Sequence, residues 1–246
     1  MLADDACDLW CIDLEGVAAA GGGDPARSPL DASERERAAR FVFERHRRWY
    51  TAARTALRGI LGAYLGLEAA AVAIEIAPLG RPRLASTAGA ASALEFNLSH
   101  CDALALVAVA RRGPLGVDVE QVRPMPDALA LAERHFVADE IAHVAQAQGA
   151  ARDAAFFTCW TRKEAVLKST GVGLSVAPCT VRVGATAEPL PLDFGAPGGV
   201  VPLVLHSLQV RDGAIGACAF APGIRLGAAY RVSGGELPGL AGAKLP

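Results

Sequence analysis

The sequence lacks the marks of several large protein classes. Its cleanest apolar run, residues 103–110, is far shorter than the roughly 20 residues that a transmembrane helix needs. It has no basic excess, since 26 acidic side chains outnumber 24 basic ones, and this argues against a general nucleic-acid binder. The acidic start of the chain has no basic stretch followed by an apolar one, so we expect no secretory signal peptide.

The six cysteines contain no CxxC pair, and a chain of this length does not need a disulfide framework. We therefore expect reduced, mostly buried thiols and a cytoplasmic protein without a membrane partner. Hydrophobic residues make up 52% of the 246 residues and charged residues 20%. That composition is enough for a sizeable core, in one large domain or in two small ones.

The apolar pattern predicts an α+β fold. We expect helices from a capping-box pattern at Ser33 and Glu36 onward to Gly66, and over residues 127–147 and 153–170. The expected strands share alternating or continuous apolar runs: 7–17, 71–78, 103–110, 115–122, 180–183, 200–205, 208–211 and 215–220. Of these, 103–110 and 115–122 are expected to pair as a hairpin around an ARRGP turn.

A weak internal echo suggests two halves. CDLWCIDLEGV near residue 7 and PLGVDVEQV near residue 114 each precede helices and then strands. We therefore expect similar α+β lobes over residues 1–112 and 113–222, and a loose tail rich in Gly, Pro and Ala at 223–246.

Asp118 and Glu120 are two residues apart on an expected strand, so their side chains face one side, with Cα atoms roughly 6.5–7 Å apart. Such carboxylates repel each other unless a divalent cation lies between them, and oxygen ligands suit Mg²⁺. On the helix that follows, Trp160, Glu164 and Lys168 share one face. Glu164 can supply a third carboxylate and Lys168 can bind an adjacent phosphate. Taken alone, each feature is more often a solvated acidic face or an exposed Glu–Lys pair.

Two further segments could contact a phosphorylated ligand. In Asn97-Leu98-Ser99-His100, before the buried strand, the histidine could bind a phosphate or an adenosine group, although a solvated histidine is commoner. The arginine-dense stretch between residues 35 and 58 also contains glutamates. Most of its arginines are therefore expected to form surface ion pairs, with one or two left to hold a phosphate.

In order and spacing, these segments resemble the surfactin-synthetase-type 4′-phosphopantetheinyl transferases. The similar blocks are NLSHCDALALVAVARRGPLGVDVEQV and FFTCWTRKEAVLKSTGVGLS, supported by FVFERHRRWY and Gly80-Arg81-Pro82. The resemblance implies a pseudo-dimer of two similar α+β lobes with the active site in the cleft between them. It also implies magnesium-dependent transfer of phosphopantetheine from coenzyme A to a serine of an apo acyl or peptidyl carrier protein, with release of 3′,5′-ADP, by a monomer.

The resemblance further implies roles for single residues. Asp118, Glu120 and Glu164 correspond to the magnesium ligands, and Glu164 and Lys168 to the catalytic residues. The implied coenzyme A contacts are Arg37, Arg48, Arg81, Ser99, His100, Lys163 and Lys168. The carrier would contact residues 122–141, where Met125, Leu129 and Phe136 are either apolar contacts or core.

Two other functions remain open at this stage. A metal-dependent phosphoester hydrolase could use the same acids to break down coenzyme A without a carrier. A degenerate coenzyme A-binding or carrier-docking module would lack catalysis altogether. The sequence does not distinguish fatty acid, polyketide and nonribosomal peptide pathways.

Overall fold

The computed structural model describes residues 2–85 and 94–234 and divides into two compact units. Unit 1 consists of Met1–Ile76, Pro82–Arg112 and Arg225–Pro246, and unit 2 of Ala77–Arg81 and Gly113–Ile224. The division after residue 112 coincides with the predicted one. The prediction did not place the short loop 77–81 in the second unit, or residues beyond 224 in the first.

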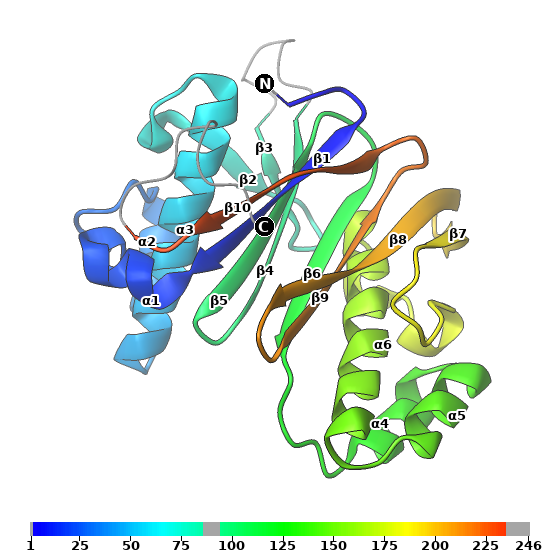
Figure 1. The fold of residues 1–246 in the computed structure, drawn as a ribbon. Helices are drawn as coiled ribbons and strands as arrows, with labels where there is room; N and C mark the ends of the chain where they lie inside the picture. Colours follow the sequence, from blue (N-terminus) through cyan, green and yellow to red (C-terminus); the bar gives the residue numbers. More distant parts are fainter. Residues whose placement is uncertain (1, 86–93, 235–246) are drawn as a thin grey trace. The chain divides into compact units, whose positions relative to one another are not determined.

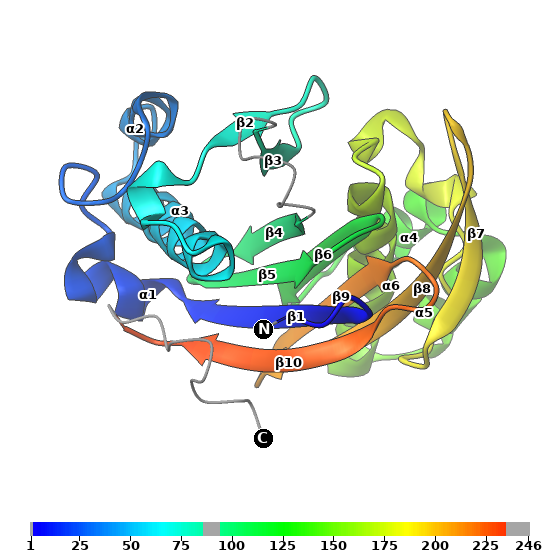
Figure 2. The ribbon, with the colours of Figure 1, turned by 90° about the horizontal axis from the view of Figure 1, so that it is seen from above.

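Unit 1 is built on a four-stranded sheet with the order β10-β1-β5-β4. The strands are β1 (Ala6–Asp13), β4 (Glu95–Cys101), β5 (Leu104–Ala110) and β10 (Arg225–Val232). β10 runs parallel to β1, and the other pairs are antiparallel. Every residue of β5 is buried, because the strand lies inside the sheet and contributes to the core that helix α3 (Glu44–Leu65) covers (Figure 2).

The other elements of unit 1 are short. They are α1 (Leu14–Val17), a π-helical turn (Ala18–Gly22), α2 (Ala32–Ala39), a 3₁₀ turn (Ala69–Ala71), β2 (Ile74–Ile76) and β3 (Pro82–Leu84). The capping box of α2 is formed by Asp31 and Glu34, not by Ser33 and Glu36 as predicted. The two patterns overlap in the sequence, and Asp31 provides the stronger acceptor for the exposed N–H groups of the first turn. Helix α3 ends at Gly66 as predicted, with the glycine in the left-handed conformation.

Unit 2 contains an antiparallel sheet with the order β6-β9-β8-β7. Its strands are β6 (Leu115–Gln121), β7 (Leu190–Ala196), β8 (Gly199–Arg211) and β9 (Ala214–Phe220). Helix α6 (Gly149–Ser169) packs against this sheet through Ala165, Val166 and Leu167 (Figure 1). The remaining helices are α4 (Ala128–His135), α5 (Ala138–Gln146) and two 3₁₀ turns (Gly173–Ser175 and Pro178–Thr180).

In both units a first strand is followed by a long helix and then by a hairpin whose last strand pairs with the first strand. In unit 1 the first strand, β1, pairs with the last strand of the β4–β5 hairpin. In unit 2 the first strand, β6, pairs with the last strand of the β8–β9 hairpin. This repeated topology gives a structural basis for the sequence echo between β1 and β6.

Three strand predictions were wrong. Residues 103–110 and 115–122 do not form a hairpin: β5 pairs with β1 and β4, whereas β6 pairs with β9 in the other sheet. The predicted strand 7–17 ends at Asp13, because the Asp13 carboxylate accepts a hydrogen bond from the Glu15 amide and starts α1. Residues 180–183 form no ladder: Thr180 is the last residue of a 3₁₀ turn, and residues 181–183 follow it without forming a strand.

The predicted loose tail at 223–246 is also wrong over residues 225–232. This segment is β10, and its Tyr230 ring stacks on Trp10 of β1 with a centroid distance of 4.1 Å. The Asp8 carboxylate also accepts a hydrogen bond from the Ala228 amide. The last part of the predicted tail, residues 235–246, lies outside the described residues. Within the described ranges, no helix is both long and apolar enough to cross a membrane.

Candidate active site

Strand β6 and helix α6 bring the three predicted acids together inside unit 2. Asp118 is buried, and Glu120 and Glu164 are half-buried. Burial raises the pKa of Glu120, and the charge of Asp118 raises it further. Burial also raises the pKa of Glu164; Lys168 opposes this shift, whereas Asp118 and Glu120 reinforce it. Each carboxylate therefore lies within the electrostatic range of the others, as their spacing predicted.

Lys168 joins the helix to the strand. Its ammonium nitrogen lies 2.6 Å from Oδ1 of Asp118. The lysine reaches solvent with part of its side chain, whereas the Asp118 side chain is almost fully covered. Lys168 therefore lies beside one of the acids, whereas its predicted contact with a phosphate and its catalytic role stay predictions.

Gly116 explains how the helix comes so close to the strand. A methyl group on this residue would lie 2.0 Å from the carbonyl oxygen of Ala165 and 2.4 Å from the amide nitrogen of Ser169. No side chain fits in that space, because the neighbouring atoms belong to the backbone of α6. The glycine of Gly-Val-Asp-Val-Glu is therefore required for packing, a role that the sequence analysis did not assign to it.

The chemistry of the acids fits a magnesium ion, although their arrangement is not a preformed metal site. In the part of the chain that the structure describes, no group of three or more His, Cys, Asp or Glu side chains is placed to hold a metal ion. The three carboxylates offer only oxygen ligands, which Mg²⁺ prefers. A divalent cation would also relieve the mutual repulsion that raises the pKa values of Glu120 and Glu164.

Lys163 does not reach the surface, so its predicted contact with coenzyme A is wrong for this structure. Its side chain is 1% exposed, and Nζ lies 2.7 Å from Oε2 of Glu140, which is itself fully buried. The same ammonium donates to the carbonyl oxygens of Pro178 and Val181. Because an ammonium has three N–H groups, all of its donors are used inside unit 2.

The guanidinium of Arg81 also binds backbone within unit 2. Nη1 donates to the carbonyl oxygens of Lys168 and Ser169, at 3.2 and 2.8 Å. Nη2 donates to the carbonyl oxygen of Leu115 at 3.2 Å. These contacts are structural, whereas the predicted role of Arg81 in binding coenzyme A stays a prediction.

The other predicted ligand contacts belong to unit 1. Ser99 is buried and His100 is exposed, and both lie on β4 itself rather than in a loop before the strand. Arg37 is exposed and lies over the Tyr50 ring; with Arg40 and Phe41 it lines a pocket of about 370 Å³. Their roles in binding coenzyme A also stay predictions.

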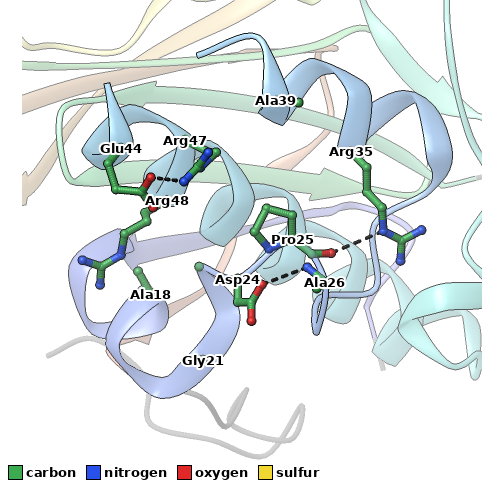
Figure 3. A pocket seen from close by; sticks show the side chains of 11 residues that line it. Ala18, Gly21, Asp24, Pro25, Ala26, Arg35, Ala39, Glu44, Arg47 and Arg48 are labelled. Atoms are coloured by element: carbon green, nitrogen blue, oxygen red, sulfur yellow. Dashed lines mark hydrogen bonds and ion pairs between the residues drawn. The ribbon is translucent and has the colours of Figure 1, made fainter. Parts of the chain in front are cut away.

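Arg48 lines a different pocket from Arg37. This pocket has a volume of about 480 Å³ and lies between the turn after α1 and the helices α2 and α3 (Figure 3). Asp24, Arg35, Glu44 and Arg47 also line it. Arg47 is paired with Glu44, and Arg35 donates to the carbonyl oxygen of Pro25. Arg37 and Arg48 therefore line different pockets, and the predicted contact of Arg48 with coenzyme A stays a prediction as well.

The segment proposed to contact a carrier contributes to the core of unit 2. Phe136 is 3% exposed and stacks on Phe156. Met125 and Leu129 are half-buried, and Met125 packs against the same cluster. Of the two alternatives left open by the sequence, core is correct for Phe136.

The sequence analysis missed a buried ionic cluster in unit 1. Arg58, 2% exposed, donates to Glu34 and Asp31 at 2.6 Å each and to the carbonyl oxygen of Val72 at 2.7 Å. Arg54 also binds Glu34. Their spacing of four residues on α3 was visible in the sequence, but nothing there showed that this face is buried.

Comparison with known families agrees with the geometry in unit 2. Residues 114–192, which carry all three acids and Lys168, match the 4′-phosphopantetheinyl transferase superfamily. Residues 25–112 match the family described as 4′-phosphopantetheinyl transferase, N-terminal. Over these two segments the chain is similar to the 4′-phosphopantetheinyl transferases.

Individual 4′-phosphopantetheinyl transferases are similar over part of the chain. HetI of Nostoc sp. is 42% identical over 59% of this chain and 61% of its own length. A Bacillus subtilis 4′-phosphopantetheinyl transferase is 25% identical over 68% of this chain and 72% of its own. The L-aminoadipate-semialdehyde dehydrogenase-phosphopantetheinyl transferase of Schizosaccharomyces pombe is 26% identical over 65% of this chain and 66% of its own. The matches support the superfamily and do not establish the surfactin-synthetase type.

Proposed function

We propose that the chain is a 4′-phosphopantetheinyl transferase that moves the phosphopantetheine arm of coenzyme A to a serine of an apo acyl or peptidyl carrier protein. The observation that supports this most directly is the convergence of Asp118, Glu120 and Glu164 next to Lys168. Diphosphate chemistry needs positive charge and positioning more than covalent participation by the enzyme. A lysine beside carboxylates whose oxygens suit a divalent cation would supply both.

In the proposed reaction, the serine oxygen attacks the β-phosphorus of coenzyme A. The bond from that phosphorus to the bridging oxygen breaks, and 3′,5′-ADP leaves. Asp118, Glu120 and Glu164 would hold Mg²⁺, whose charge would offset the negative charge of the diphosphate. The carboxylate of Glu164 would accept the serine proton as the attack proceeds. The Lys168 ammonium stabilises the leaving phosphate.

The test is the intact mass of an apo carrier protein after incubation with the chain, coenzyme A and Mg²⁺. Transfer adds about 340 Da to the carrier, the mass of the phosphopantetheine group that this chemistry moves. Glu164→Gln should abolish the gain and leave the circular dichroism spectrum unchanged. Glu188→Gln, an exposed glutamate of the same unit, is the matched control and should transfer normally.

The same assay separates the alternative functions. A phosphoester hydrolase would release 3′,5′-ADP from coenzyme A without any carrier. A binding module would leave both coenzyme A and carrier unchanged. Chelation by EDTA should stop transfer, and excess Mg²⁺ should restore it; full turnover in EDTA would remove the metal from the proposal. We also propose a monomeric, cytoplasmic enzyme, and sedimentation of the purified chain tests the first of these.

A further inference from the structure

Loop 77–81 lies between the two short strands β2 and β3 of unit 1 but belongs to unit 2. Its last residue, Arg81, makes the contacts that attach it there. The guanidinium donates to the carbonyl oxygens of Lys168 and Ser169 at the end of α6, and to that of Leu115 at the start of β6. One side chain therefore connects the two elements that carry the acids.

The carbonyl oxygens at the end of α6 can accept hydrogen bonds from such a partner. The last four carbonyls of a helix have no acceptor role within the helix, and the helix dipole makes this end negative. A guanidinium satisfies both conditions, and its planar fork can serve separate oxygens at once. A lysine at the same position would offer one compact ammonium in place of this planar fork.

The glycines around Arg81 support the same arrangement. Gly171 has φ +74°, and a methyl group on it would lie 3.2 Å from Cδ of Arg81. The Arg81 side chain thus packs directly over the turn that ends α6. Gly116, directly after Leu115, lets the strand approach the helix backbone. Where β6 begins and α6 ends, Arg81 donates hydrogen bonds to both, to the carbonyl oxygens of Leu115 and Lys168.

We propose that Arg81 is a positioning residue of the transferase site. Through the carbonyls of Lys168 and Leu115 it fixes the end of α6 on the start of β6, and so holds the Lys168 ammonium 2.6 Å from Asp118. The proposal rests on the proposed function for its kinetic consequences. It differs from the role implied by the family resemblance, in which Arg81 contacts coenzyme A itself.

Steady-state kinetics of Arg81→Lys in the full chain separates the two roles. The positioning role predicts that kcat falls about 10- to 100-fold, since a displacement of about 1 Å in a catalytic group has effects of that size. The KM for coenzyme A should stay within about twofold, because no ligand contact is lost. An unchanged kcat with a KM for coenzyme A raised tenfold would overturn the proposal. Arg83→Lys, an exposed arginine two residues away, should change neither value.

A double-mutant cycle with Lys168→Ala tests whether Arg81 acts through Lys168. If it does, Arg81→Lys should lower kcat much less in the Lys168→Ala background than in the wild-type background. Equal effects of Arg81→Lys in both backgrounds would contradict the proposal.

Amide hydrogen exchange tests the contact without any activity measurement. In Arg81→Lys, the amide of Gly171, which donates to the carbonyl oxygen of Lys168, should exchange at least tenfold faster. Exchange near Gly195 of β7 should not change. Unchanged exchange at Gly171 would refute the Arg81 contact even if the chain proved to have no transferase activity. A wild-type chain that labels no carrier would instead refute the proposed function alone.

Discussion

Replacing Lys163 by methionine tests whether the lysine of Trp-Thr-Arg-Lys-Glu supports the fold or the ligand. The change removes the only positive charge within ion-pair distance of the fully buried Glu140 among the described residues. It also takes the hydrogen-bond donor from the carbonyl oxygens of Pro178 and Val181. Methionine keeps most of the apolar stem, so the loss is mainly one of charge and hydrogen bonding.

The expected loss is large because a buried charge is left uncompensated. Breaking a buried ion pair from one side costs about 3–5 kcal/mol, and each abandoned carbonyl adds about 0.5–1 kcal/mol. For the two carbonyls the total is about 4–7 kcal/mol, which is comparable to the whole stability of many domains. With a urea dependence of about 2–3 kcal/mol per molar, the unfolding midpoint of unit 2 should fall by about 2 M.

Urea unfolding followed by circular dichroism measures this shift, and Lys168→Met on the same helix is the matched control. Lys168 makes an ion pair that is open to solvent on one side, so its loss should reduce stability less and transfer activity far more. Adding Glu140→Gln to Lys163→Met should recover part of the lost stability, because it removes the uncompensated charge. A Lys163→Met protein with an unchanged midpoint and a tenfold higher KM for coenzyme A would show that Lys163 binds the ligand instead.

Three further changes test other parts of the structure. Gly116→Ala should cost about 3 kcal/mol or more in thermal unfolding, because β6 and α6 must move apart. In the control Gly195→Ala, the added methyl group would have no atom within 4 Å, so the loss should be less than about 1 kcal/mol. Similar losses for both variants would refute the close approach of β6 and α6. Arg58→Met should destabilise unit 1 by about 3–5 kcal/mol in urea, since its acidic partners stay behind. Burial raises the pKa of Cys159 to about 12, whereas Cys179 is exposed. A thiol reagent at pH 8 should therefore label Cys179 before Cys159. Peptide mass mapping that finds Cys159 modified first would contradict the burial of Cys159.

The acids and Lys168 could be predicted because their placement depends on local geometry alone. Residues two apart on a strand share one face, and so do residues four apart on a helix, whatever the rest of the chain does. That α6 packs against β6 required only that both present apolar residues. Gly116 was part of the same motif, and its role needed the distance to the α6 backbone, which no pattern contains.

Apart from the capping box of α2 and the end of β1, the failures involve partners far away in the sequence. The ARRGP turn showed that the chain reverses, but not that the next strand would join another sheet. Lys163 directly precedes Glu164, and helical periodicity places it on another face without saying that Glu140 covers that face. Gly, Pro and Ala predicted a loose end at residues 225–232, because a parallel strand takes its stability from a partner that the local sequence does not reveal.

The return of β10 to β1 has a consequence for how the protein is made. During translation, the sequence of unit 2 is synthesised before the strand that completes the sheet of unit 1. Until then β1 exposes an open edge, and Trp10 lacks the Tyr230 ring that stacks on it. The usual order, in which the amino-terminal domain matures first, therefore does not apply to unit 1, because its sheet is completed only after the sequence of unit 2 has been made.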